Sequence, residues 1–252
     1  MLSFRRWWWV LVLVLALFAG GFVVWADSTA PPMSEALKAL ESAASTDGVI
    51  VDASEWLAFL PADREPTIGL VFYPGGRVDP RAYAPAARSI AAEGPLVVIV
   101  PMPLNLAVFG QGRAESVFGA FPRVTHWAIG GHSLGGAMAA RFVHRHPTSV
   151  EGLVLWASFR ADGDGLAEQD IEVVSIYSTL DGVATVDEIN ASRPRFPSDT
   201  RWVAIEGGNH AQFGWYGTQA GDNPAAVSRE SQQRTAVAET IRLLESLPAE
   251  EE

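Results

Sequence analysis

Ser133 lies in a pattern that is typical of a reactive serine. Residues 130–136 read GGHSLGG and contain Gly-x-Ser-x-Gly. An apolar run ends just before this segment and a helix-forming stretch begins at Leu134, so we expect a sharp turn from strand to helix. At such a turn backbone passes where a Cβ atom would lie, which requires glycine on both sides of the serine. The pattern therefore predicts an outward-pointing nucleophile at Ser133; the alternative is an ordinary glycine-rich turn.

A serine hydroxyl is a weak nucleophile near neutral pH and needs a general base. His210 lies in Gly-Gly-Asn-His, just after the last predicted strand. That is the place of the base when the catalytic residues follow one another in the order serine, acid, histidine. A structural role is the better interpretation of the other four histidines, which are His126, His132, His144 and His146.

The acid that orients the histidine should lie between Ser133 and His210, at the end of a strand. Asp181 follows the apolar run that ends at Tyr177 and fits this position. Taken alone, Asp181 and the glycine after it would be a turn-forming pair. Asp187 and Glu206 are the alternative acids.

Two backbone N–H groups should stabilise the negative charge that develops on the substrate oxygen. The first is the N–H of Leu134, at the N-terminus of the predicted helix. The second should come from the loop after residues 68–73, which begins Pro-Gly-Gly-Arg at Pro74. Gly76 is the first choice as donor and Gly75 the second, and a simple turn is the alternative interpretation.

The elements that must position these residues alternate along the chain. Residues 49–51 and 56–60 predict a short hairpin, and later strands are expected at 68–73, 96–100, 127–129, 153–156, 173–177 and 202–205. Helices are expected near 80–92, 111–120, 134–145, 186–192 and 225–247. Strands that are apolar throughout and alternate with helices predict an α/β fold with a doubly wound, mostly parallel sheet.

The N-terminus predicts a membrane-spanning helix. Arg5 and Arg6 precede three tryptophans, and an uncharged run continues to Trp25 before Asp27. Nineteen residues of helix rise about 28 Å, close to the thickness of the hydrocarbon core. The basic pair predicts a cytoplasmic N-terminus and a single-pass protein of the cell membrane, with its domain on the extracytoplasmic side. The alternative is a signal peptide, cleaved after small residues at 24 and 26, and a secreted protein.

The expected organisation is an anchor or signal segment at 1–30, a stalk helix at 31–47, a domain at 48–248 and an acidic tail at 249–252. Ser34 is the expected N-cap of the stalk helix.

The chain has 252 residues and a formal net charge of −11, which argues against nucleic acid as a partner. Because it contains no cysteine, disulfides, thiolate nucleophiles and Cys-ligated metals are excluded.

Together these residues resemble the α/β-hydrolase superfamily, and specifically its small lidless bacterial branch, family 5. The resemblance covers about 48–247 and is carried by residues 72–76, 102–107, 130–136, 153–158, 181–184 and 207–213. It implies a Ser133–Asp181–His210 triad, an oxyanion hole at Leu134 and the Gly75–Gly76 turn, and hydrolysis of ester-like bonds without a cofactor or metal.

The sequence departs from the family at Pro74, where many relatives have histidine, so the hydrogen bonds that position this loop are expected to differ. Residues 160–170 are too short and polar to form a cap domain, which predicts an open site. Aromatic candidates to line an acyl pocket are Phe109, Trp156 and Phe213, with Phe159 and Trp215 as further possibilities.

The expected substrate is a small-molecule or lipid-like carboxylic ester. An amidase, a peptidase or an acyltransferase would use the same residues, and a non-catalytic envelope binding protein is the alternative from another class.

Overall fold

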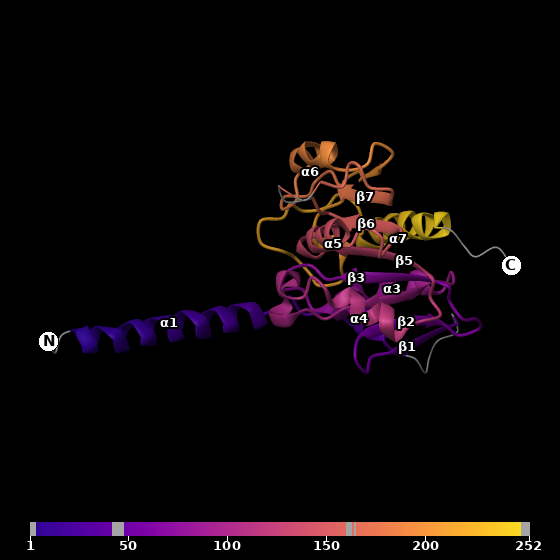
Figure 1. The fold of residues 1–252 in the computed structure, drawn as a ribbon. Coiled ribbons are helices and arrows are strands. Elements are labelled where there is room, and N and C mark those ends of the chain that lie inside the picture. The colour runs from indigo at the N-terminus through magenta and orange to yellow at the C-terminus, as the bar shows by residue number, and fades with distance from the viewer. Residues whose placement is uncertain (1–3, 42–47, 160–162, 164, 248–252) are drawn as a thin grey trace.

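The structure is a computed structural model that describes residues 4–41, 48–159, 163 and 165–247. Its main feature is an eight-stranded sheet from which one long helix projects (Figure 1). The strands are β1 (Val49–Asp52), β2 (Leu57–Pro61), β3 (Ile68–Tyr73), β4 (Leu96–Ile99), β5 (His126–His132), β6 (Gly152–Trp156), β7 (Glu172–Ser178) and β8 (Arg201–Ile205).

The sheet order is β1-β2-β4-β3-β5-β6-β7-β8. β1 and β2 form the expected antiparallel hairpin, and β2 runs antiparallel to β4. All other neighbouring strands are parallel. The α/β fold with a mostly parallel sheet is therefore confirmed, and the carboxyl ends of β3 to β8 all lie at one edge of the sheet, the carboxyl edge.

Helices cover both faces of this sheet, because its parallel strands are apolar throughout. α3 (Ala84–Ala91) and α7 (Arg229–Ser246) share one hydrophobic cluster with the sheet, and α4 (Arg113–Ala120) and α5 (Leu134–Arg145) share the other. The remaining helix of the domain is α6 (Val186–Ser192). α7 begins four residues later than its predicted start at 225, because Ser228 caps it by accepting the N–H of Ser231.

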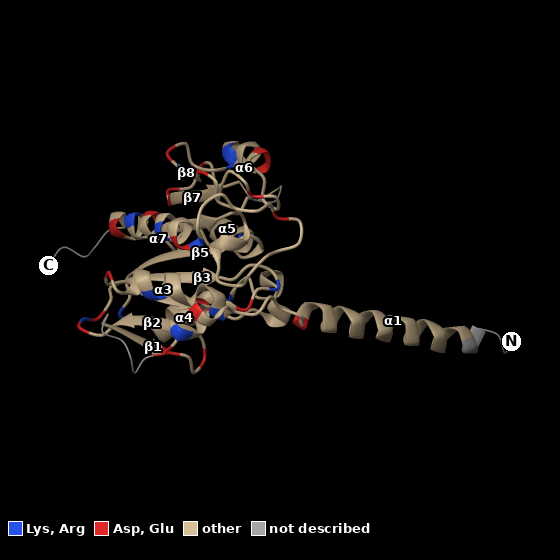
Figure 2. Cartoon of the chain, turned by 180° about the vertical axis from the view of Figure 1, so that it is seen from behind, with Lys and Arg blue, Asp and Glu red and all other residues tan. Residues whose placement is uncertain are grey.

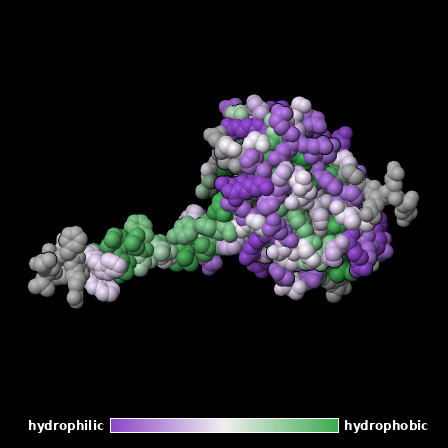
Figure 3. Space-filling model, in the orientation of Figure 1, coloured by the Kyte–Doolittle hydropathy of each residue, from purple (hydrophilic) through white to green (hydrophobic). Residues whose placement is uncertain are grey.

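The N-terminal helix α1 (Phe4–Asp27) contains one candidate membrane span, Trp7–Asp27, with a mean hydropathy of 2.5. Figure 2 shows the coloured part of this helix after Arg5 and Arg6 free of charged residues until its end, whereas both signs of charge are scattered over the domain. Its apolar side chains stand exposed outside the domain (Figure 3). The helix is therefore long and apolar enough to cross a membrane, and a signal sequence would have the same properties.

The segment after α1 lies against the domain. α2 (Ser34–Lys38) has Met33 at its N-cap rather than the predicted Ser34, whose hydroxyl bonds to the carboxylate of Glu35. Ala36 is fully buried, and the N–H of Met33 donates to the carbonyl of Trp215. The described part of residues 31–47 thus ends at 41 and is packed onto the domain.

No helix or strand is formed by the described members of the 160–170 segment, in which 160–162 and 164 lie outside the described residues.

Candidate active site

Ser133 lies at the turn between β5 and α5, with a backbone φ of +53° and ψ of −123°. Such a conformation is strained for a residue other than glycine. Flanking glycines make it possible: a Cβ at Gly135 would lie 2.1 Å from the carbonyl oxygen of Tyr73, and one at Gly131 would lie 2.6 Å from the carbonyl carbon of Gly135. The serine itself is only half-buried, so the turn presents it at the carboxyl edge.

His210 and Asp181 are brought together by the loops that follow β8 and β7. His210 Nδ1 lies 2.8 Å from Asp181 Oδ2, and both side chains are completely buried. The other carboxylate oxygen, Oδ1, accepts the backbone N–H groups of Val183 at 2.8 Å and Ala184 at 2.7 Å. The carboxylate therefore has a fixed orientation and in turn fixes the imidazole ring.

The second ring nitrogen of His210 is not used by Asp181. Its Nε2 is buried and has no hydrogen-bond partner in the part of the chain that the structure describes. The centroid of the His210 ring lies 4.5 Å from that of His132, the residue before Ser133. Serine, histidine and aspartate, which lie far apart in the sequence, thus gather at the carboxyl edge.

The alternative residues lie elsewhere. Asp187 is exposed on α6, and Glu206 is exposed just after β8. His126 bonds to Glu151, His144 to the carbonyl of Gly165, and His146 pairs with Glu115. Within the described residues none of these five is bonded to His210, so the geometry favours Asp181 and His210 over them.

The two candidate oxyanion glycines differ in their hydrogen bonds. The N–H of Gly75 donates to Tyr83 Oη at 2.9 Å. The N–H groups of Gly76 and Leu134 have no acceptor among the described residues. A Cβ on Gly76 would lie 3.0 Å from Leu134 Cδ2, so the two residues are neighbours. This arrangement favours Gly76 over Gly75 as a donor to a substrate oxygen.

A buried chain of hydrogen bonds supports the loop that begins at Pro74. Tyr83 Oη, which accepts from Gly75, also lies 2.8 Å from His132 Nδ1. Burial, and then the charge of His210, lower the pKa of His132 well below its usual value, while burial raises the pKa of Tyr83. Both groups are therefore neutral near pH 7. The role of Tyr83 was missed in the sequence, where the departure at Pro74 was the only signal.

Asp222 connects the loops that carry the acid and the base. Its Oδ1 accepts the backbone N–H of Gly182 at 3.1 Å and that of His210 at 3.2 Å, and its Oδ2 accepts that of Ala211 at 2.8 Å. Asp222 therefore holds the residue after Asp181 and the base itself in one cluster. No local pattern predicted it, because residues 220–228 look like a simple polar loop.

The aromatic residues predicted to line an acyl pocket lie in different surroundings. Trp156 is 1% exposed, and its indole N–H donates to Thr240 on α7. Phe213 is 0% exposed and stacks on His132. These two are core residues with no surface to offer to a substrate. Phe109 is exposed, at 53%, and the two further possibilities, Phe159 and Trp215, are half-buried.

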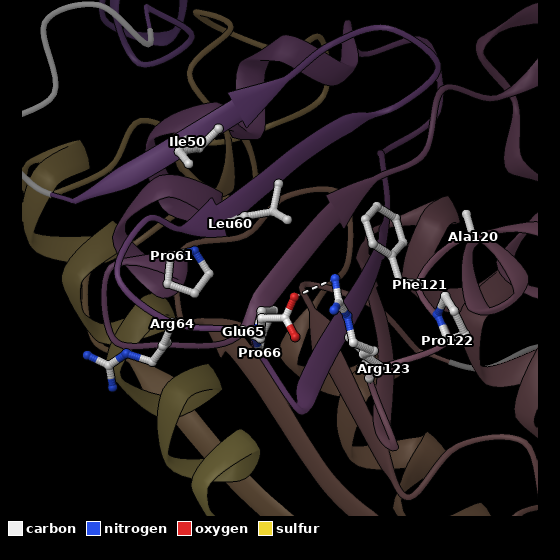
Figure 4. A pocket seen from close by; sticks show the side chains of 11 residues that line it. Ile50, Leu60, Pro61, Arg64, Glu65, Pro66, Ala120, Phe121, Pro122 and Arg123 are labelled. Atoms are coloured by element: carbon white, nitrogen blue, oxygen red, sulfur yellow. Dashed lines mark ion pairs between the residues drawn. The ribbon is translucent and has the colours of Figure 1, made fainter.

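Figure 4 shows a pocket of about 270 Å³ at the opposite, amino edge of the sheet. It is lined by residues 60, 61, 64–66 and 120–124 and by Ile50, and an ion pair joins Arg123 to Glu65 across it. None of the candidate catalytic residues lines this pocket. Within the described residues, no group of three His, Asp or Glu side chains is arranged to hold a metal ion.

Comparison with known proteins identifies the family. A sequence model of the alpha/beta hydrolase family matches residues 69–234, more than half of the chain. The chain belongs to the alpha/beta hydrolase family, which supports a hydrolase activity. No curated protein matches the sequence.

Among solved structures, the chain is similar to one from a study of LipS and LipT, two metagenome-derived lipolytic enzymes. The identity is 14% and the TM-score 0.56, over 77% of this chain and 99% of that one. It is also similar to the esterase domain of a Rhodothermus marinus protein, with 12% identity and a TM-score of 0.55, over 75% and 93% of the two chains. At these identities the likeness establishes the fold.

Proposed function

We propose that this protein is a serine hydrolase that cleaves carboxylic esters, with Ser133 as nucleophile, His210 as general base and Asp181 as the residue that orients His210. The observation that carries the proposal is the buried 2.8 Å contact between His210 and Asp181, with Nε2 of the same ring left without a partner beside the Ser133 turn. An imidazole held in this way accepts a proton at Nε2.

In the proposed reaction, Ser133 Oγ attacks the ester carbonyl carbon while its proton moves to His210 Nε2. The N–H groups of Leu134 and Gly76 stabilise the oxyanion. The C–O bond to the alcohol then breaks, and the alcohol leaves with the proton from His210. Water then attacks the acyl-enzyme and gives one proton to His210. The acyl C–O bond to Ser133 breaks, His210 returns the proton to Ser133 Oγ, and the carboxylic acid leaves.

The N-terminal helix belongs to the proposal as a retained single-pass anchor, with the domain on the extracytoplasmic side. Its span of 21 residues and its hydropathy of 2.5 support a membrane helix. Phe109 remains the first candidate for substrate contact, because in the predicted aromatic set it alone is exposed, whereas the other four members are buried or half-buried.

A fluorophosphonate probe tests the nucleophile. Wild type should be labelled at Ser133, whereas Ser133→Ala should show neither labelling nor hydrolysis of p-nitrophenyl acetate. Ser89→Ala, at an exposed serine on α3, is the matched control and should behave as wild type. Folded wild type that is never labelled would contradict the proposal and favour a binding protein. Labelling with faster turnover of anilide than ester substrates would contradict the ester assignment.

A further inference from the structure

The C-terminal end of α1 packs against the loop that carries the candidate oxyanion glycines. The Trp25 ring lies under the guanidinium of Arg77, 4.4 Å from ring centroid to Cζ. Arg77 Nη2 donates to the carbonyl of Ser28 at 2.8 Å, and the Arg77 carbonyl accepts the N–H of Ala30 at 2.8 Å. Arg77 directly follows Gly76. The apolar helix is therefore joined to the domain beside the candidate site.

A second loop, residues 103–109 after β4, completes this junction. Asn105 Nδ2 donates to the carbonyl of Ala26 at 3.3 Å, and the Asn105 carbonyl accepts the N–H of Arg77 at 2.8 Å. Phe109 packs edge-on against Phe22 of α1, with 6.3 Å between ring centroids. Both loops follow neighbouring parallel strands, so the helix end, the two loops and Ser133 share the carboxyl edge.

Exposed apolar side chains gather at this edge. Outside α1, the large apolar side chains that stand exposed among the described residues are Leu37, Ile50, Leu104, Val108, Phe109 and Leu180. Three of the six lie on the 103–109 loop, and Leu180 immediately precedes Asp181 at the end of β7. Because residues 103–109 follow β4 and Leu180 follows β7, exposed apolar groups lie on both sides of Ser133 along the sheet.

Leu104 is notable because its backbone does not favour leucine. Its φ is +53°, a left-handed conformation that suits glycine, asparagine or aspartate. The side chain is nevertheless 37% exposed to solvent. Insertion of the Leu104 side chain into the apolar part of a membrane would explain why leucine occupies this strained and exposed position.

The length of α1 indicates how deep in the membrane the contact between α1 and the two loops lies. A 21-residue span rises about 31 Å, the thickness of the hydrocarbon core, with tryptophans near both ends. Tryptophan concentrates at the membrane–water interface, which places Trp25 at headgroup level. Arg77 and the 103–109 loop contact this end of the helix, and Figure 3 shows the hydrophobic surface of α1 reaching the domain.

We propose that the carboxyl edge of the sheet faces the bilayer, that the 103–109 loop inserts into its interface, and that the substrate is an acyl ester carried by a membrane lipid. The substrate assignment rests on the proposed function. Because the chain after Arg6 carries 16 basic and 29 acidic residues, a net charge of −13, a neutral or zwitterionic lipid surface is favoured. The ester would enter from the bilayer side, past Phe109, to Ser133.

The absence of cysteine from the chain allows a direct test of depth. Full-length Phe109→Cys and Ile50→Cys are labelled with a polarity-sensitive fluorophore and reconstituted in phosphatidylcholine vesicles that contain a brominated lipid quencher. The two positions are matched, since their side chains are 53% and 51% exposed. We expect at least a several-fold stronger quenching at 109 than at 50. Equal, weak quenching at both positions would overturn the orientation.

Activity tests the substrate class. Leu104→Asp should lower hydrolysis of a fluorogenic ester lipid in the same vesicles about 10-fold or more, while the rate on water-soluble p-nitrophenyl acetate stays unchanged. Ile50→Asp should change neither rate.

Hydrolysis of the soluble ester without any preference for the vesicle ester would overturn the lipid assignment and leave the proposed function standing. Strong quenching at 109 without hydrolysis of either ester would overturn the proposed function and the substrate class together, and would support the orientation alone.

Discussion

Asp181 differs from the other candidate acids in the surroundings of its carboxylate. Two backbone N–H groups and the His210 ring bond to Asp181, whereas Asp187 and Glu206 are exposed to solvent. A carboxylate that orients a catalytic imidazole must itself be fixed by further hydrogen bonds. Among the three candidate acids, only Asp181 meets this condition. The three acids have equal chemistry, so position alone decides between them.

The first prediction concerns Asp181→Asn. The amide preserves the shape but leaves the imidazole in the wrong tautomer, so kcat should fall by about 10³-fold or more while KM changes little. Steady-state kinetics on p-nitrophenyl acetate measures this. Asp187→Asn, at an exposed position on α6, is the control and should keep wild-type kcat. A loss of less than 10-fold in Asp181→Asn would exclude it as the orienting acid.

The buried His132 provides a second prediction at this scale. Its pKa is lowered by burial, so below about pH 6.5 the unfolded chain binds this proton more readily than the folded chain. The contribution of His132 to stability is therefore complete above that pH. It is lost as the pH falls from 6.5 toward the folded value, by at most about 1.4 kcal/mol per pH unit.

Urea unfolding of the full chain in detergent micelles, between pH 7.5 and 5.0, measures this effect. His132→Gln keeps a polar side chain that does not titrate, so its unfolding free energy should fall less steeply below pH 6.5 than that of wild type. Parallel curves for the two proteins would contradict the burial argument.

The loops after β7 and β8 act as one unit because Asp222 bonds to both. Without Asp222, the N–H groups of Gly182, His210 and Ala211 would lose an acceptor inside a crowded site. Gly182 itself is constrained, since a Cβ there would lie 2.5 Å from the carbonyl oxygen of Gly221. The loop before α7 thus positions the acid and the base relative to one another.

We predict that Asp222→Ala lowers kcat about 10-fold to 100-fold with a small change in KM. The reason is that a displaced His210 is poorly oriented for proton transfer, whereas substrate binding is little affected. Asp222→Asn keeps one acceptor oxygen and should recover part of the loss. Steady-state kinetics and the melting temperature are both measured, with Asp199→Ala at an exposed turn as control. A lower melting temperature with unchanged kcat would show that Asp222 is only structural.

At the scale of the whole molecule, the domain is not suspended from α1 by a free linker. Trp25, Ala26 and Ser28 contact the loops beside the candidate site, and Ala30 forms a bridge with Val78. The orientation of the domain relative to α1 is therefore set by direct packing. A retained helix would give the domain one preferred face toward the membrane.

The prediction for the whole chain is that the protein remains in the membrane fraction after an alkaline carbonate wash. A variant that lacks residues 1–26 should move to the soluble fraction. N-terminal sequencing of the full-length product is the control for processing. A soluble wild-type product that begins at Asp27 would show a cleaved signal and contradict the retained anchor.

The sequence by itself determined the order and type of the elements. The apolar runs that became β3 to β8 and the helix that begins at Leu134 could be located because local periodicity reports which faces are buried. Ser133, His210 and Asp181 were singled out because their order and strand-end positions are local features too.

Only the tertiary structure decided what these residues contact. In the structure the N–H of Gly75 donates to Tyr83 whereas that of Gly76 has no acceptor among the described residues, and Asp222 accepts the N–H of His210. Trp156 and Phe213 lie in the core, and the ring of Trp25 packs against the guanidinium of Arg77. Each of these facts depends on residues distant in sequence, whose side-chain directions are set by packing against one another. Local propensity does not contain that information.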